Sequence, residues 1–190
     1  RLIASMDMYI YNTYQESLVV DQYISSEIDL LDKEQGLKII QTSEFPYNGY
    51  SEIKILNSNN KETIIYFRIP SWDQKTKILI NGEEINYKTF NGYAKIYRKW
   101  KAGDKIELKF DFTPRFVRTN PNVRYNIRKA CIFRGPILYC LEEKDNGKNL
   151  NNIIIDSLND IDEKNIKINS QNVTSLFTKG YKLKDTKKLY

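Results

Sequence analysis

The sequence of 190 residues contains no histidine and only two cysteines. Without histidine, the chain cannot contain a Ser-His-Asp triad, a Cys-His dyad, a histidine-ligated zinc ion or a histidine acid or base. The two cysteines, Cys131 and Cys140, are too few for a zinc site of four thiolates or for a disulfide scaffold. The sequence therefore suggests no metal or redox framework within this chain.

Long apolar runs are missing as well. Runs such as Ile64-Ile65-Tyr66-Phe67 stop far short of the ~20 residues that cross a bilayer. The segment 1–6 begins with Arg1 instead of Met and lacks the apolar core of a secretory signal. We therefore expect no membrane partner, and we expect the chain to be a piece of a longer protein.

Acidic side chains are absent from one segment. The chain has 30 basic and 24 acidic residues, a net charge of +6, but there is no Asp or Glu between Phe112 and Leu141. The basic residues of this segment account for the whole excess, and they are Arg115, Arg118, Arg124, Arg128, Lys129 and Arg134. Arginine is the residue for fixed, planar, partly buried partners.

Two kinds of partner fit this segment. Nucleic-acid binding requires a basic face with exposed aromatic residues, and Arg115-Phe116-Val117-Arg118 followed by Arg124-Tyr125 is a weak match. Alternatively, the guanidinium groups pair with carboxylates of a neighbouring domain. We expect the second, with no nucleic-acid partner, and the residues expected to make these interdomain contacts are Arg115, Arg118, Arg124, Arg128 and Arg134.

From about residue 14 onward, apolar residues recur with the period of two that is typical of strands. The segment 105–112 alternates strictly and predicts a half-buried antiparallel strand. Further short strands are predicted at 18–24, 37–41, 50–56, 63–69, 76–80, 93–98, 129–134, 137–142, 153–155 and 165–168. The pairs 48–49, 81–82, 91–92 and 146–147 are all Asn-Gly, which favours turns with positive φ angles. The pattern predicts a mainly β chain of antiparallel sandwiches.

Other patterns mark divisions of the chain. Leu2, Ile3, Met6 and Ile10 follow the 3.6-residue period of a short N-terminal helix. Prolines in 114–121 are incompatible with a central strand, so this segment is the expected domain junction. Beyond residue 145 the sequence becomes rich in Asn, Lys and Asp, and we expect the second sandwich to stop early.

Several residues invite a functional interpretation. The adjacent acids Glu83-Glu84 and Glu142-Glu143 suggest a glycosidase pair, but neighbours on a strand point to opposite faces, so we interpret them as solvated surface. Fourteen Tyr and two Trp could form a sugar-stacking platform or belong to the core. Cys131 and Cys140 flank the turn at Gly135-Pro136, so a hairpin would bring their strands together, whether or not the thiols face each other.

The arginine segment also resembles a known family. The matching motifs are Val117-Arg118-Thr119-Asn120-Pro121-Asn122-Val123-Arg124 and Ala130-Cys131-Ile132-Phe133-Arg134-Gly135-Pro136-Ile137-Leu138-Tyr139-Cys140-Leu141-Glu142. Supporting motifs occur in the same order upstream, at Arg1-Leu2-Ile3-Ala4-Ser5, Arg68-Ile69-Pro70-Ser71-Trp72, Gly92-Tyr93 and Trp100-Lys101-Ala102-Gly103-Asp104. Over roughly 1–145 the chain resembles the non-catalytic C-terminal region of glycoside hydrolase family 127, the β-L-arabinofuranosidases.

This resemblance implies a domain organisation. Family members have a helical (α/α)6 catalytic barrel followed by β-sandwich domains, and their nucleophile is a cysteine bound to zinc beside further Cys and a Glu ligand. Residues 1–12 would be the last helix of a missing barrel, 13–115 the first β-sandwich and 116–190 a truncated second one. Cys131 and Cys140 do not match the catalytic positions, so the resemblance implies no catalytic, cofactor-binding or metal-binding residue in this chain. Zinc is expected only in the missing domain.

The resemblance also implies a function. We expect an accessory portion of a bacterial, cytoplasmic glycoside hydrolase that supports the catalytic barrel and takes part in a homodimer. By itself this portion would be inactive. The alternative is a carbohydrate-binding module that uses exposed aromatic residues.

Overall fold

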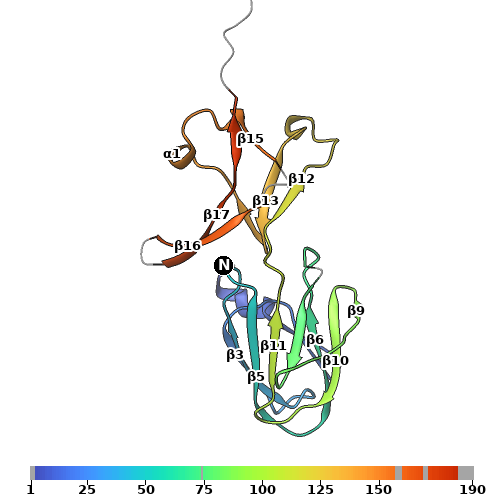
Figure 1. Ribbon diagram of the computed structural model, residues 1–190. Helices are drawn as coiled ribbons and strands as arrows, with labels where there is room; N and C mark the ends of the chain where they lie inside the picture. The colour runs from blue at the N-terminus through green and yellow to red at the C-terminus, as the bar shows by residue number, and fades with distance from the viewer. Residues whose placement is uncertain (1–2, 74, 157–159, 169–170, 184–190) are drawn as a thin grey trace, which may run out of the picture. The chain divides into compact units, whose positions relative to one another are not determined.

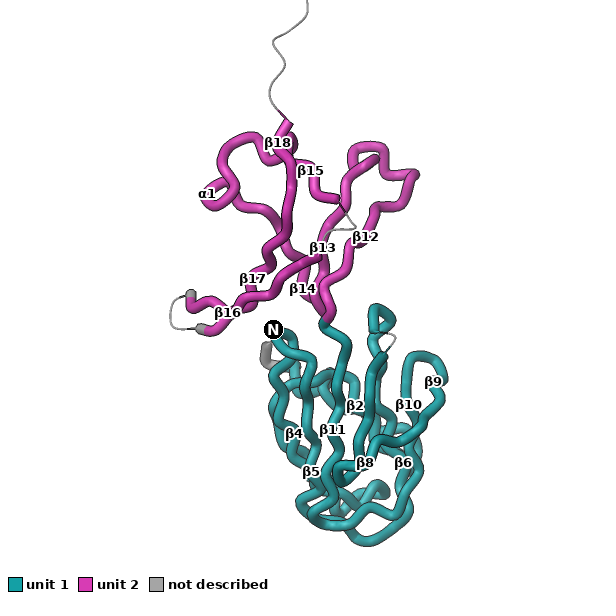
Figure 2. Tube along the Cα trace, in the orientation of Figure 1, with its two compact units in different colours: residues 1–112 teal, residues 113–190 magenta. Residues whose placement is uncertain are grey.

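The computed structural model describes residues 3–73, 75–156, 160–168 and 171–183. Strands predominate, as the sequence predicts (Figure 1). The chain divides into two compact units, unit 1 (Arg1–Phe112) and unit 2 (Thr113–Tyr190), shown in Figure 2. The sequence places the domain boundary after residue 115, whereas the units divide after Phe112. Strand β12 (Arg115–Arg118) pairs with β13 (Ala130–Arg134) inside unit 2.

Unit 1 begins with the 3-10 helix η1 (Ile3–Tyr9), which is followed by two layers of β-sheet. One sheet has the order β1-β2-β6-β10-β9 and the other β3-β4-β5-β11-β7-β8. The bounds are β1 (Tyr11–Tyr14), β2 (Ser17–Val20), β3 (Ser26–Leu30), β4 (Leu37–Ser43), β5 (Tyr50–Ser58), β6 (Glu62–Arg68), β7 (Lys77–Ile80), β8 (Glu83–Glu84), β9 (Thr89–Phe90), β10 (Tyr93–Lys99) and β11 (Lys105–Lys109).

The N-terminal helix ends three residues before the predicted residue 12. It ends at Tyr9, because Tyr11 pairs with Val20 and the chain has already joined the sheet as β1. A second difference concerns direction, since β2 and β6 run parallel, with Leu18 opposite Ile65. The chain leaves β2 for the other sheet and returns as β6, and a long crossover of this kind permits parallel pairing.

Side chains from both sheets meet in one core. In β6, Thr63, Ile65 and Phe67 point inward, and Ile106 and Leu108 do the same in β11. The buried cluster contains Leu18, Val20, Tyr23, Leu37, Ile39, Ile53, Ile55, Ile65, Phe67, Ile78, Ile80, Ala94, Ile96, Trp100, Ile106, Leu108, Phe110 and Phe112. The period of two in the sequence therefore corresponds to the burial of one face of each sheet, and unit 1 is a β-sandwich.

The Asn-Gly pairs have two different roles. Asn81-Gly82 and Asn91-Gly92 have positive φ angles and form the predicted tight turns between β7 and β8 and between β9 and β10. The prediction was wrong for Asn48-Gly49, where neither residue is left-handed. A Cβ atom at Gly49 would lie 2.5 Å from the carbonyl oxygen of Phe110, so glycine is needed there for space. At 146–147, only Gly147 has a positive φ angle.

Unit 2 consists of small sheets joined by short helices. The antiparallel sheet β12-β13-β14 is accompanied by the pairs β15-β18 and β16-β17. The remaining bounds are η2 (Arg124–Asn126), β14 (Ile137–Tyr139), α1 (Glu143–Asn146), η3 (Leu150–Asn152), β15 (Ile153–Ile155), β16 (Asp162–Ile168), β17 (Gln171–Phe177) and β18 (Gly180–Lys182). Strand β14 ends three residues before the predicted 142. Among the described residues, the buried hydrophobic side chains all lie in unit 1, so the second sandwich stays a prediction.

Two phenylalanines in one sheet of unit 1 test the core. Phe67 is fully buried, whereas Phe90 is 73% exposed. We predict that Phe67→Ala lowers the free energy of unfolding of unit 1 by about 3–5 kcal/mol, because it removes a buried ring and leaves a cavity. Phe90→Ala is the matched control and should change it by less than about 0.5 kcal/mol. Urea titration followed by Trp fluorescence measures this unit, because Trp72 and Trp100 both lie in it. Equal effects of the two substitutions would contradict this assignment of the core.

Candidate functional site

The five arginines expected at interdomain contacts all lie in unit 2. Arg115 and Arg118 are the first and last residues of β12, and Arg134 is the last residue of β13. Arg124 opens η2, and Arg128 has a positive φ angle of 64° in the connection to β13. The structure separates them into two groups, because two are engaged within unit 2 and three are exposed.

Arg115 and Arg134 hold parts of unit 2 together. The Nη2 atom of Arg115 donates a hydrogen bond of 3.2 Å to the carbonyl oxygen of Gly135, and its guanidinium carbon lies 5.7 Å from the ring centroid of Phe133. The Nε atom of Arg134 donates to Glu163 Oε2 at 2.7 Å, and only 12% of the Arg134 side chain is exposed. This ion pair joins β13 to β16, and charge-assisted contacts of this length are among the stronger hydrogen bonds.

The other three arginines belong to an exposed loop between β12 and β13. We call residues 118–129 the arginine loop. Arg118, Arg124 and Arg128 are exposed there, and the ring of Tyr125 is 92% exposed. Unit 1 has 15 basic and 16 acidic residues, whereas unit 2 has 15 basic and 8 acidic residues. The positive charge of the chain is therefore concentrated in unit 2, and the arginine loop presents it to solvent.

The acid pairs adjacent in the sequence do not form a catalytic arrangement. Glu83 and Glu84 form the exposed strand β8, where Glu84 Oε2 accepts from Lys77 Nζ at 3.0 Å. Glu142 and Glu143 are exposed at the start of α1.

A pair of acids that the sequence did not reveal lies across two strands of unit 1. Glu52 in β5 is directly opposite Glu107 in β11, and the hydroxyl of Tyr50 is 2.9 Å from a carboxylate oxygen of each. Lys105 Nζ lies 2.9 Å from Glu52 and 3.5 Å from Glu107. The phenol occupies the space between the two carboxylates, so the arrangement holds both acids in place and leaves no room for a glycosidic bond.

Burial and neighbouring charges shift the pKa values in this cluster. Burial, with hydrogen bonds to Glu107 and Glu52, raises the pKa of the Tyr50 phenol well above its usual value. The hydrogen bond from Lys105 is the main cause that lowers the pKa of Glu52, and the same contact raises the pKa of Lys105. The cluster is therefore a phenol and an ammonium group that together hold two carboxylates on the sheet surface. Only the pairing of β5 with β11 brings it together, and no local motif could have revealed it.

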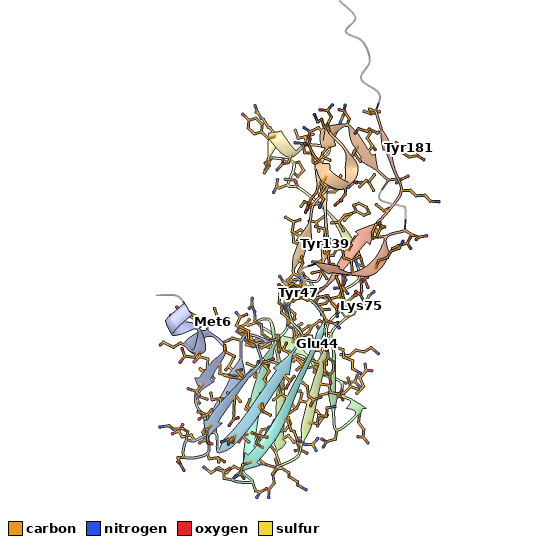
Figure 3. All side chains as sticks on the ribbon, turned by 90° about the vertical axis from the view of Figure 1, so that its left-hand side faces the viewer. Met6, Glu44, Tyr47, Lys75, Tyr139 and Tyr181 are labelled. Carbon is orange, nitrogen blue, oxygen red and sulfur yellow. The ribbon has the colours of Figure 1, made fainter. Side chains whose placement is uncertain are left out.

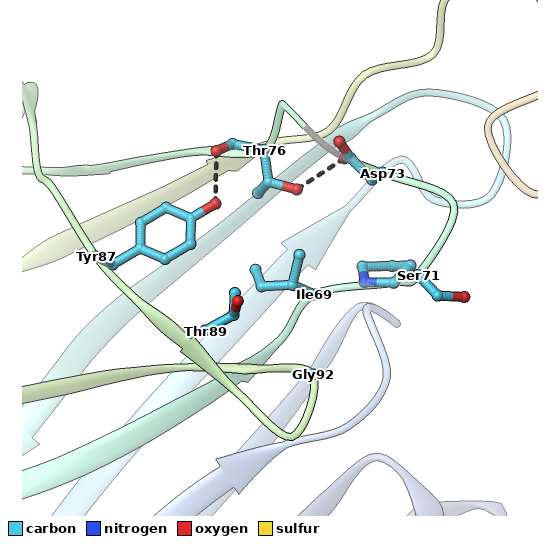
Figure 4. Close-up of a pocket in the computed structure, with 8 residues that line it drawn as sticks. Ile69, Ser71, Asp73, Thr76, Tyr87, Thr89 and Gly92 are labelled. Carbon is cyan, nitrogen blue, oxygen red and sulfur yellow. Dashed lines mark hydrogen bonds between the residues drawn. The ribbon is translucent and has the colours of Figure 1, made fainter.

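Unit 1 contains a polar hollow of about 440 Å³. Figure 4 shows its lining side chains in close-up. Its lining residues are Ile69, Pro70, Ser71, Asp73, Thr76, Tyr87, Thr89 and Gly92. Asp73 is buried, and its Oδ2 atom accepts from Thr76 Oγ1 at 2.8 Å and from the backbone N–H of Asp111 at 2.9 Å. The hydroxyl of Tyr87 donates to the carbonyl oxygen of Thr76 at 2.6 Å. These hydrogen bonds therefore stabilise the loop around Asp73.

Trp72 is part of an aromatic cluster in unit 1. Its ring centroid lies 6.3 Å from that of Phe45 and 5.7 Å from that of Phe112. Tyr23 and Phe110 complete the cluster. Exposed aromatic side chains are spread over separate elements of both units, and Figure 3 marks Tyr47 in unit 1 and Tyr181 in unit 2.

Family models match almost the whole of the described chain. Residues 17–112 match the middle domain of the GH127 β-L-arabinofuranosidases, and residues 114–177 match the C-terminal domain of glycoside hydrolase family 127. The chain belongs to glycoside hydrolase family 127. The family assignment made from the motifs in the sequence is confirmed, and the two family domains meet where the two units divide.

Individual relatives of this GH127 chain agree with the assignment. A non-reducing end β-L-arabinofuranosidase from Bifidobacterium longum is 32% identical, over 77% of this chain and 23% of that protein. The crystal structure of a GH127 β-L-arabinofuranosidase from Geobacillus stearothermophilus is 30% identical, with a TM-score of 0.89 over 100% of this chain and 31% of that one. A further GH127 β-arabinofuranosidase structure is 26% identical, with a TM-score of 0.81 over 95% of this chain and 33% of that one. The chain thus spans a quarter to a third of the length of these relatives.

The residues of this GH127 chain do not fit the zinc ion that the family resemblance implies. In the ranges that the structure describes, no group of three or more His, Cys, Asp or Glu side chains could hold a metal ion. Cys131 and Cys140 are both free thiols in unit 2. We therefore derive no catalytic step from these residues.

No helix in the described residues is long and apolar enough to cross a membrane.

Glu52 gives unit 1 a stability that depends on pH. Because its pKa is lowered in the folded state, its contribution is present above the unfolded-state pKa of about 4.3 and is lost as the pH falls through the lower, folded value. We predict that Glu52→Gln destabilises unit 1 by less than about 1 kcal/mol at pH 7, because the ion pair of Glu52 with Lys105 is partly exposed to solvent, which screens it. The difference in the free energy of unfolding between the variant and the unchanged chain should become smaller towards pH 3. Urea midpoints from Trp fluorescence at a series of pH values test this, with the exposed Glu83→Gln as the control. A difference that grows on acidification would refute the role given to Glu52.

Proposed function

We propose that this chain is the non-catalytic β portion of a bacterial β-L-arabinofuranosidase-type glycoside hydrolase. The observation that carries the proposal is the succession of matches to the middle and C-terminal domains of family 127, in that order. The chain also spans only 23–33% of the length of its relatives. In this proposal, the two units support an (α/α)6 catalytic barrel that another part of the polypeptide forms.

The chemistry of the described residues supports an accessory role. Most glycosidases use two carboxyl groups on either side of an open space that accepts the sugar. In the Glu52–Glu107 pair, the hydroxyl of Tyr50 fills that space. Asp73 uses its oxygens to brace a loop, and Glu83 and Glu142 are exposed beside turns.

The catalytic groups belong, in this proposal, to the barrel. Its cysteine nucleophile and zinc ion would lie outside the present residues, so this chain would supply no ligand to the metal. We place the protein in the bacterial cytoplasm, where structural disulfides are rare and those that form are transient.

The arginine loop is the part of this chain that we assign to contacts with the catalytic portion. Its three exposed guanidinium groups are those of Arg118, Arg124 and Arg128. No Asp or Glu occurs between Phe112 and Leu141, so these groups have no acidic neighbour in the sequence. Guanidinium groups match carboxylates with two parallel hydrogen bonds, and such pairs gain most when they leave water together. A second copy of the chain in a homodimer would also offer carboxylates to these arginines. The experiment must therefore distinguish the catalytic portion from a second copy as the partner.

The first test is activity. We expect the isolated chain, with or without added zinc, to release no aryl group from an aryl β-L-arabinofuranoside above the rate without protein. A full-length GH127 arabinofuranosidase in the same assay is the positive control, and circular dichroism establishes that the isolated chain is folded. Saturable turnover that is proportional to the concentration of the isolated chain would overturn the proposal.

The second test concerns the arginine loop. We predict that the combined variant Arg118→Glu, Arg124→Glu, Arg128→Glu leaves the thermal midpoint of the isolated chain unchanged. In a longer polypeptide that includes the catalytic portion, the same variant should lower the midpoint by several degrees, because the reversed charges repel the carboxylates that they meet. Replacing the exposed Lys144, Lys148 and Lys167 by Glu changes the net charge equally and is the control. Sedimentation of the isolated chain distinguishes the catalytic portion from a second copy as the partner of the loop. If the unchanged chain forms a dimer and the variant does not, the loop contacts a second copy.

A further inference from the structure

The two cysteines of the chain lie on the two arms of one hairpin. Cys131 belongs to β13, and Cys140 directly follows Tyr139, the last residue of β14. The connection between the strands is Gly135-Pro136, with a positive φ angle of 55° at the glycine. Both thiols are free, Cys140 is exposed and Cys131 is half-buried. Solvent and small reagents can therefore reach this part of the hairpin.

The register of the hairpin, extended by one position beyond its last pair, sets the two cysteines opposite each other. Arg134 pairs with Ile137, Phe133 with Leu138 and Ile132 with Tyr139. Each step away from the turn moves one residue back on β13 and one residue forward beyond β14. The next position of the ladder therefore sets Cys131 against Cys140.

The kind of position also suits a covalent link. In a hairpin with a two-residue turn, the pair next to the turn exchanges both backbone hydrogen bonds, and the pairs then alternate in type. Counting from the pair next to the turn, the cysteines occupy a position without backbone hydrogen bonds between them. Opposite residues at such positions have Cα atoms about 4.5 Å apart and side chains on the same face. Disulfides join Cα atoms about 4.4–6.8 Å apart.

Little holds the two thiols in their present positions. Cys131 Sγ is 3.5 Å from the carbonyl oxygen of Val117, its partner on β12, and a thiol is a weak donor. Cys140 lies beyond the last paired residue of β14 and is exposed. Forming a bond between the sulfur atoms therefore disrupts only the weak contact of Cys131 with Val117 and no backbone pairing of Cys140.

We propose that Cys131 and Cys140 form a reversible intramolecular disulfide when the chain meets a low-molecular-weight disulfide such as oxidised glutathione. One cysteine, as a thiolate, attacks a sulfur of the reagent, forming a mixed disulfide and releasing one glutathione thiolate. The second cysteine then attacks the sulfur of the first and releases the other glutathione. Two protein thiols are oxidised, and one oxidised glutathione is reduced to two glutathione molecules.

The disulfide adds one covalently linked pair of residues at the end of the hairpin that is opposite the turn. It ties the segment that leads into α1 to β13, the central strand of its sheet, and it closes a ring from residue 131 to residue 140. A cross-link of this kind restricts the unfolded chain and so favours the folded unit. The state of the thiols thus sets how firmly the connection between β14 and α1 is held.

Mass spectrometry of the full chain tests the proposal directly. After incubation with oxidised glutathione at low protein concentration, we expect the free thiols to fall from two per chain to none and the mass to fall by two hydrogen atoms. Proteolysis without reductant should yield one linked fragment pair that contains both cysteines. Reduction should restore both thiols.

Matched variants separate this bond from general thiol reactivity. Cys131→Ser and Cys140→Ser each leave one thiol, so each should gain a single glutathione and form no ring. Glutathione on both cysteines of the unchanged chain, two unreacted thiols, or disulfide-linked dimers at low protein concentration would overturn the proposal.

Calorimetry supplies a second readout. The thermal transition of unit 2 should move to higher temperature on oxidation and back on reduction. The double variant Cys131→Ser, Cys140→Ser should show one midpoint whatever the redox state, with its fold checked by circular dichroism. A lower midpoint in the oxidised chain would contradict the stabilising role assigned to the bond.

Discussion

The structure of unit 1 depends on the burial of one face of each of its two sheets against the other. Side chains of Ile39 and Ile53 from one sheet meet those of Ile65 and Phe67 from the other, and all four are fully buried. Apolar surface removed from water contributes roughly 25 cal/mol per Å², so a core of this kind is the largest favourable contribution to folding. The surface features of unit 1, including the cluster of Tyr50, Glu52 and Glu107, lie on the strands and turns that this core holds in place.

Unit 2 depends less on a buried apolar core and more on specific polar contacts. Its apolar side chains are half-buried or exposed where described, and specific polar contacts connect its sheets. The ion pair of Arg134 with Glu163 and the hydrogen bond from the Tyr139 hydroxyl to the carbonyl oxygen of Thr174 each join the sheet β12-β13-β14 to the hairpin β16-β17. A unit with a small core and an excess of positive charge gains stability when another surface covers it. This agrees with an accessory domain that works within a larger protein.

Local sequence predicts the features that depend on neighbouring residues. The alternation at 105–112, the turns at Asn81-Gly82 and Asn91-Gly92 and the motifs of family 127 can all be read from a few consecutive residues. Features that depend on which strands become neighbours cannot be read in this way. The convergence of Glu52 and Glu107 on Tyr50 needs the register of β5 and β11, and the need for glycine at position 49 arises from the approach of Phe110. The arginines show both cases, because the sequence finds the basic segment but not the pairing of Arg134.

The parallel pairing of β2 with β6 also has a consequence for the order of folding. Hairpin β1-β2 closes through nearby residues, but its place in the sheet requires Leu18 to meet Ile65 after the intervening strands have entered the other sheet. Contacts between distant residues form late and slow the folding of β proteins. As the ribosome releases the chain from its N-terminus, β2 has no partner on its inner side until β6 has emerged, and during that interval its apolar residues are open to chaperones and to other chains.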